Sequence, residues 1–336
     1  MLKLTAAAAL LVATYASAFA QEFPAKTVRV IVGFPPGGAA DIAARLISQK
    51  LGDLWGRQVI VDNRPGAGGN LGAEMVAKAA PDGYTLHLAF GPTAPSMYPK
   101  LPFDPQKDFA PITLMAQSPM VLVVHPSVPA SNVKELIALA RSHPGKLNYA
   151  STGVGITVHL AMELFRIMAK INIVHVPYKG ASPAVVDLLG GQIELTILST
   201  SSILGQIKTQ RVRALAVTSL ERSFMLPDVP TLNEAGVPGY ETTIWWGLSA
   251  PAGTTRELVQ RLNAAAVKSL GEPDIRKKFA DEGAKVIGST PAEFGEFVNQ
   301  ELAKWDYVVR TSGIRAQLDA DGLVRLAAIH GGPSSR

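Results

Sequence analysis

A buried strand that runs directly into a glycine-rich helix start most constrains what this chain can fold into. The apolar run VRVIVG, residues 28–33, is followed by FPPGGAAD, residues 34–41, and then by a helical pattern of apolar residues. Such a turn presents backbone N–H groups beyond the end of the strand, and the helix dipole favours an anion there. We therefore expect a small carboxylate or phosphate to bind at this turn.

Residues 1–20 have the features of a cleavable export signal. Lys3 precedes an apolar stretch, and Ala18-Phe19-Ala20 fits the small-x-small rule for cleavage. The stretch is too short to span a membrane, and no later segment offers roughly eighteen uninterrupted apolar residues. We therefore predict a mature, soluble protein of about 315 residues in the periplasm.

Composition limits the fold and the partners. The chain has no cysteine, so its fold must be held by its apolar core without disulfides. A chain of this length exceeds what one core usually organises, which favours two lobes. The formal net charge of +5 falls to +4 when Lys3 leaves with the signal, and proline and glycine are scattered. Neither a nucleic-acid partner nor a disordered arm is indicated.

Two α/β units follow one another along the chain. Near-continuous apolar strands alternate with helical patterns up to about residue 90, and a second alternation begins near residue 133, which favours parallel sheets with helices on both faces. Two β-rich connectors, residues 112–124 and 242–250, are predicted to join the lobes around a hinged cleft. The predicted first lobe is residues 21–122 and 246–336, and the second is residues 123–245. Two sequential domains, which need only one crossing, are the alternative.

The last part of the chain reads as helical. It contains the capping box Thr290-Pro291-Ala292-Glu293, and we expect the last helices to cover the first lobe.

The second unit repeats the strand–turn–helix device at residues 151–157, STGVGIT. Two helix starts that face each other across a cleft could grip one or both ends of a carboxylate, with hydroxyls from Ser151, Thr152 and Thr157. The alternative is that the glycines only turn the chain and the hydroxyls only cap helices. Asp41 is awkward for an anion site, and it could instead complement the helix dipole or hold the loop amides in shape.

Catalytic, nucleotide and metal motifs are missing. The glycines of residues 63–70 lack the third glycine of a dinucleotide loop, because Leu71 stands there. No Walker loop, HExxH or GxSxG is present, and the six histidines sit singly, so we predict no catalytic residue, no metal and no cofactor. The alternative is an exported α/β hydrolase in which Ser151 is the nucleophile and His159 the base, but the sequence offers no third residue to complete a catalytic triad. Trp245 and Trp246 point to opposite faces, so at most one should line the cleft.

Several long strings resemble one family. Among them are FPPGGAAD, VDNRPGAGGNLGAE, KAAPDGYTL, VHVPYKG, DLLGGQIEL and LPDVPTLNEAG. The chain resembles the Bug (TctC-type) extracytoplasmic solute receptors of tripartite tricarboxylate transport systems over nearly the whole mature sequence. The resemblance implies a type II periplasmic binding fold, capture of a small mono- or dicarboxylate partly through main-chain amides and bridging water, and delivery to membrane permease subunits. A monomer is expected. A solute sensor that signals without a permease is the alternative.

The resemblance also implies which residues bind the ligand. The binding loops are residues 34–41 and 151–157, here named the first loop and the second loop, and the turn at residues 90–94 is a further wall. Ser199 stands where relatives often carry an acid, which disfavours a ligand with an ammonium group. Ile156 and Trp246 also depart from the family and should reshape the pocket. The predicted ligand-binding residues are Phe34, Gly37, Gly38, Ala39, Asp41, Gly91, Thr93, Ser151, Thr152, Gly153, Gly155, Thr157, Ser199 and Trp246.

Overall fold

The computed structural model describes residues 23–91, 95–98, 101–318 and 324–328. The predicted export signal, residues 1–20, and the predicted ligand-binding residue Thr93 lie outside the described residues.

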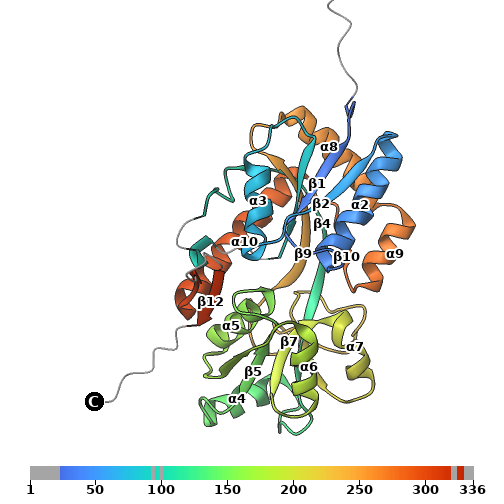
Figure 1. Ribbon diagram of the computed structural model, residues 1–336. Coiled ribbons are helices and arrows are strands. Elements are labelled where there is room, and N and C mark those ends of the chain that lie inside the picture. The colour runs from blue at the N-terminus through green and yellow to red at the C-terminus, as the bar shows by residue number, and fades with distance from the viewer. Residues whose placement is uncertain (1–22, 92–94, 99–100, 319–323, 329–336) are drawn as a thin grey trace, which may run out of the picture.

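The first lobe begins as the predicted strand–helix alternation. Its elements are β1 (Val28–Val32), α2 (Ala39–Trp55), β2 (Val59–Asn63), the short helix η1 (Ala67–Gly69), α3 (Asn70–Ala77), β3 (Thr85–Phe90) and the short helix η2 (Pro95–Met97). The strands are parallel, and β1 lies between β2 and β3. Figure 1 shows β1, α2, β2 and α3 in the upper part of the molecule. The carboxyl ends of β1 and β3 therefore lie side by side.

Two long strands connect this lobe to the second. The 16-residue strand β4 (Phe109–Val124) pairs with β9 (Thr243–Pro251) up to Pro119. From Met120 onward β4 pairs instead with β7 (Leu195–Ser199) and β8 (Arg213–Val217). The same ten-stranded sheet thus runs through both lobes (Figure 1).

The chain returns beside this crossing. The Thr218 hydroxyl accepts a hydrogen bond from the Met120 amide at 2.9 Å, and the Thr218 carbonyl accepts one from the Thr242 amide at 2.9 Å. The chain thus passes between the lobes at least twice, and two sequential domains joined by one crossing are not what forms. The strand pairing of β4 changes at residues 119–120, slightly before the predicted lobe boundary at residues 122–123. The lobe boundaries at residues 122–123 and 245–246 stay a prediction.

The second lobe repeats the alternation. Its remaining elements are α4 (Val133–Ser142), β5 (Asn148–Ser151), α5 (Thr157–Ala169), β6 (Val174–Pro177), α6 (Ala181–Leu189) and α7 (Thr200–Lys208). Strand β5 is parallel to both β6 and β7. The second loop therefore begins at the carboxyl end of the central parallel strand, as the first loop does in the other lobe.

The C-terminal helices divide between the lobes. The elements here are α8 (Arg256–Leu270), α9 (Pro273–Asp281), β10 (Lys285–Val286), α10 (Pro291–Ser312) and the hairpin β11–β12 (Ile314–Leu318 and Val324–Ala328). Helices α8 and α9 pack against α2, as expected for a cover of the first lobe. Helix α10 opens with the predicted capping box, but Trp305, Val308 and Val309 near its end are buried in the same core cluster as Phe165 of α5. The expected cover of the first lobe is therefore correct for α8 and α9 and incomplete for α10, which packs against both lobes.

Within the part of the chain that the structure describes, no helix combines the length and apolar character that crossing a bilayer requires.

Candidate functional site

Loops from both lobes meet where the strands of each lobe end. The turn after β3 begins at Gly91, and a Cβ atom placed on Gly91 would lie only 3.1 Å from the Thr157 hydroxyl oxygen at the start of α5. The glycine has φ of +66°, so a larger residue would be both strained and in steric conflict. The structure thus brings two predicted site residues, Gly91 and Thr157, into direct proximity across the lobe junction.

The first loop presents its backbone to solvent. Residues 35–39 are exposed, and α2 begins after Gly38 without a side-chain cap. The amides of the first helical turn have no intrahelical acceptor, and Ala39, the first residue of α2, is exposed, whereas Ala40 and Asp41 are buried. The Phe34 ring packs edge-on against Phe90, with ring centroids 5.2 Å apart, and fixes where the loop leaves β1.

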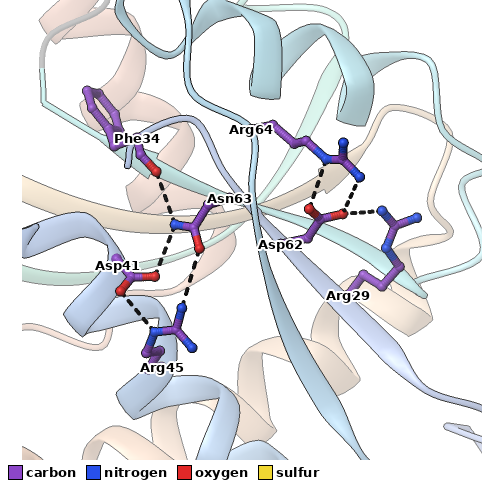
Figure 2. Close-up of polar contacts among 7 residues, drawn as sticks. All are labelled: Arg29, Phe34, Asp41, Arg45, Asp62, Asn63 and Arg64. Carbon is purple, nitrogen blue, oxygen red and sulfur yellow. Dashed lines mark hydrogen bonds and ion pairs between the residues drawn. The ribbon is translucent and has the colours of Figure 1, made fainter. Parts of the chain in front are cut away.

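Asp41 holds the first loop from inside. The residue is only 3% exposed, and its Oδ2 accepts hydrogen bonds from the Gly37 amide and from Arg45 Nε, both at 2.9 Å. Its Oδ1 accepts one from Asn63 Nδ2 at 3.0 Å (Figure 2). Burial raises the pKa of Asp41, but the hydrogen bonds from these three groups outweigh it, and the pKa is lowered. The sequence left open whether Asp41 complements the helix dipole or holds the loop amides in shape. These contacts show that it holds the loop in shape.

Asn63 is a site residue that the sequence interpretation did not include. Its amide nitrogen donates to the Phe34 carbonyl as well as to Asp41, both at 3.0 Å. Strand β2 is parallel to β1 with Val32 opposite Asn63, so the asparagine necessarily ends beside the first loop. A polar residue at the end of the neighbouring strand is the signal that could have identified it.

A second ionic cluster fixes the segment that follows β2. Asp62 accepts from Arg29 and lies 2.8 Å from Arg64 Nε, as Figure 2 shows beside the Asp41 cluster. Burial raises the pKa of Asp62, but the hydrogen bonds from the two guanidinium groups outweigh it and lower the pKa. These ion pairs fix the end of β2, where Asn63, the next residue after Asp62, supports the first loop.

The second loop is held by buried polar groups as well. Ser151 is fully buried, and its hydroxyl donates to the Gly153 carbonyl at 3.0 Å and lies 2.6 Å from His175 Nε2. The Gly155 amide donates to His159 Nδ1 at 2.8 Å. The side chains of Ser151 and His159 are buried and lie beneath the loop. In contrast, Thr152, Gly153 and Thr157 are only partly buried, and Ile156 is exposed.

Two histidines stack beneath this loop. The rings of His159 on α5 and His175 on β6 are nearly parallel, with centroids 3.9 Å apart, and Tyr149 stacks on His175 at 5.0 Å. The Tyr149 hydroxyl donates to Glu163 Oε1 at 2.6 Å, and burial together with that carboxylate raises the pKa of Tyr149. The sequence showed six single histidines, and the fold pairs two of them.

The two loops share one local device. In each, the side chain three positions after the N-cap accepts a hydrogen bond from the glycine amide just before the N-cap: Asp41 from Gly37, and His159 from Gly155. This fixes the glycine turn and leaves the first-turn amides of the helix unobstructed, much as the reciprocal bond of a capping box does. A carboxylate plays this part in one lobe and an imidazole nitrogen in the other.

The two tryptophans separate as the sequence analysis predicted. Trp246 is 3% exposed, and its indole nitrogen donates to the Ala39 carbonyl at 3.2 Å behind the first loop. Trp245 points to the other face of the sheet, where its indole nitrogen donates to Glu301 of α10 at 3.0 Å. Ser199, also predicted, is half-buried at the end of β7 opposite Met120. Trp246 thus supports the first loop from behind.

The described residues contain no group of three or more His, Cys, Asp or Glu side chains that could hold a metal ion. For the hydrolase alternative, the geometry pairs Ser151 with His175 and leaves the serine without access to a substrate, since none of its surface is exposed. Neither the acidic and histidine side chains nor the Ser151–His175 pair forms a catalytic centre among the described residues of this junction.

Two α/β lobes that share crossing strands and bring loops together at their junction define a bilobal solute-binding protein. Residues 43–314 match the model of the tripartite tricarboxylate transporter family receptor, TctC, and the chain belongs to this family of periplasmic solute receptors. It is a receptor family and not an enzyme class. The predicted family, the bilobal fold and the receptor function are thereby confirmed.

Similar proteins include a curated relative and two solved structures. BugT of Bordetella pertussis is 36% identical, over 88% of this chain and 92% of that protein. An R. palustris protein solved with adipate is 37% identical, covers 87% of this chain and 99% of its own, and superposes with a TM-score of 0.72. MatC from Rhodopseudomonas palustris, solved with bound malate, is 35% identical, covers 85% of this chain and 100% of its own, and has a TM-score of 0.71.

Proposed function

We propose that this protein captures a small mono- or dicarboxylate between its lobes and delivers it to the membrane permease of a tripartite tricarboxylate transporter. The observation that carries the proposal is the shared device of the two loops, each of which opens a helix at a strand end, with the start of α5 beside Gly91 of the other lobe. In the proposal residues 1–20 direct export and are removed, and the receptor works as a monomer.

The chemistry follows from the exposed amides. Helix-start amides bind carboxylate oxygens through charge-assisted hydrogen bonds, and closure of the lobes excludes water and strengthens those bonds. The relatives solved with adipate and malate support a carboxylate as the ligand class. The segment Leu198-Ser199-Thr200-Ser201 offers no acid to an ammonium group, which favours a plain organic acid over an amino acid.

Ala39→Pro tests the first loop. Ala39 is the first residue of α2, where proline is well tolerated, and the preceding Gly38 has φ −84° and ψ 171°, which a following proline accepts. The substitution removes one amide N–H and little else. Because a hydrogen bond to a charged partner contributes about 1.5–3 kcal/mol, we expect carboxylate affinity in calorimetry to fall roughly 10- to 100-fold.

Two further variants make the test specific. Thr157→Pro removes the equivalent amide of the second loop, after Ile156 with φ −88° and ψ 172°, and Thr157→Ala controls for the lost hydroxyl. Arg256→Pro places a proline at the same helical position of α8, away from the junction, and should leave affinity unchanged. Unchanged binding in both loop variants, or preferential binding of neutral compounds, would contradict the proposal.

The permease is tested separately. Cross-linking of the ligand-loaded receptor in native membranes should capture the integral membrane subunits of the transporter. Capture of a sensor kinase in their place would favour the signalling alternative.

A further inference from the structure

A chamber of about 240 Å³ lies in the first lobe between the sheet, α3 and α10. Aromatic rings form much of its wall: Phe34, Phe90, Phe103, Phe109, Trp245 and Phe294. Trp245 and Phe294 meet edge-on with centroids 6.1 Å apart, and Phe103 and Phe109 do so at 5.6 Å. The wall therefore offers ring faces and edges rather than charge.

The ionisable groups of the chamber are neutral or already paired. His87 keeps some accessible surface because it faces the chamber, yet protein surrounds it, and burial lowers its pKa to about 4. Glu301 Oε2 accepts from the indole nitrogens of Trp245 at 3.0 Å and Trp305 at 2.8 Å, and Glu301 also pairs with Lys304. Neither residue favours a charged guest.

The chamber begins at the residues that adjoin both loops. Gly33 and Phe34 line it and lead into the first loop, and Phe90 lines it and is followed by Gly91, which meets Thr157. A molecule whose head group sits on the loop amides therefore has this apolar space within reach of its tail.

We propose that the chamber receives the apolar, ring-bearing tail of the carboxylate, so that the preferred ligand is an aryl-substituted organic acid. The inference rests on the proposed function. An apolar cavity of roughly 150 Å³ suffices to bind benzene, and this one is larger. Edge-to-face contacts with the surrounding rings add to the gain from burying apolar surface.

The test is calorimetry of the mature protein with acetate, butyrate, 3-phenylpropionate and the uncharged 3-phenylpropanol. We expect 3-phenylpropionate to bind at least about tenfold more tightly than butyrate. Ala73→Phe fills the chamber from α3 and should abolish that advantage while leaving acetate binding unchanged. Ala77→Phe, one turn further along α3 and not part of the chamber wall, is the matched control and should keep the advantage. Ala89→Leu fills the chamber from β3 and provides an independent test in case Ala73→Phe does not fold.

The outcomes separate the two proposals. If acetate and butyrate bind but the phenyl group brings no gain, or the gain survives both filling variants, the chamber is not a tail site and the proposed function stands. If none of the acids binds, the proposed function fails first. If the alcohol binds as tightly as the acid and the filling variants abolish both, the chamber is supported and the carboxylate head group is contradicted.

Discussion

Replacing Asp41 by asparagine should loosen the first loop, because asparagine cannot accept all the hydrogen bonds that the carboxylate accepts. Two donors, the Gly37 amide and Arg45 Nε, converge on Oδ2, and Asn63 Nδ2 donates to Oδ1. Either rotamer of the new amide therefore turns its NH₂ group toward a donor. Rotating the Asn63 amide to compensate would break its bond to the Phe34 carbonyl.

The magnitude follows from which bonds are lost. Hydrogen bonds to a charged group contribute about 1.5–3 kcal/mol each, but the Arg45 side chain is 55% exposed, so solvent reduces its share to at most about 1 kcal/mol. The Gly37 and Asn63 bonds are partly replaced by neutral ones. We expect Asp41→Asn to lower the free energy of unfolding by roughly 2–3 kcal/mol and to weaken carboxylate binding, because the loop amides lose their fixed orientation.

The effect should depend on pH in a defined direction. The folded-state pKa of Asp41 lies below its ordinary value of 3.8, so its stabilisation is fully present above that value. The stabilisation is lost as pH falls through the lowered pKa, where the folded carboxyl also takes up a proton. The difference in the free energy of unfolding between wild type and Asp41→Asn should therefore be constant from pH 5 to 8 and become smaller only below about pH 4.

Urea denaturation across this pH range, with calorimetry at pH 7, measures both effects. Glu293→Gln, which also removes a carboxylate that accepts from a loop amide but lies at the start of α10, is the control for general loss of charge. It should cost stability without altering affinity. Equal stability of wild type and Asp41→Asn at pH 7, or a gap that widens on acidification, would refute the role assigned to Asp41.

Three further outcomes are expected. His159→Leu leaves the buried Gly155 amide without its acceptor and should cost about 1–3 kcal/mol together with ligand affinity, whereas His159→Asn, which keeps an acceptor near Nδ1, should restore most of both in the same assays. In an NMR titration, the His87 ring should protonate only near pH 4. Because the unfolded chain binds that proton from about pH 6.5 downward, stability should fall by up to roughly 3 kcal/mol between pH 6.5 and 4, a slope that His87→Gln removes. Thr290→Ala breaks the capping box with Glu293 and should lower thermal stability by about 1 kcal/mol with ligand affinity unchanged.

The local signals were sufficient to predict most of the fold. The two predicted strand–turn–helix devices both form, β1 with α2 around residues 34–41 and β5 with α5 around residues 151–157. Strand-end glycine turns and helix periodicity are written in consecutive residues, so they can be read without knowing the tertiary structure. The alternation of strands and helices predicts, for the same reason, the parallel pairing of β1 with β2 and β3 and of β5 with β6 and β7.

What could not be predicted depends on residues that the fold brings together. His159 and His175 belong to a helix and a strand whose stacking depends on the packing of α5 on the sheet, and no spacing rule joins them. The burial of Ser151 likewise follows from the neighbouring strand that carries His175. The last helices were expected to cover the first lobe, and nothing along the chain marks where the contacts of α10 pass from one lobe to the other.

The contacts of Asp41 also remove the main objection to an anion site at the first loop. An isolated carboxylate in the first turn of α2 would repel a bound carboxylate, but this one is buried, paired with Arg45 and saturated by the Gly37 and Asn63 donors. Its charge is therefore compensated locally, while the amides that it orients still present the positive end of the helix dipole. In the second loop His159 orients Gly155 in the same way with an unprotonated ring nitrogen, since a nitrogen that accepts from an amide carries no proton. An anion at the junction thus meets two helix starts and no uncompensated negative charge from either support.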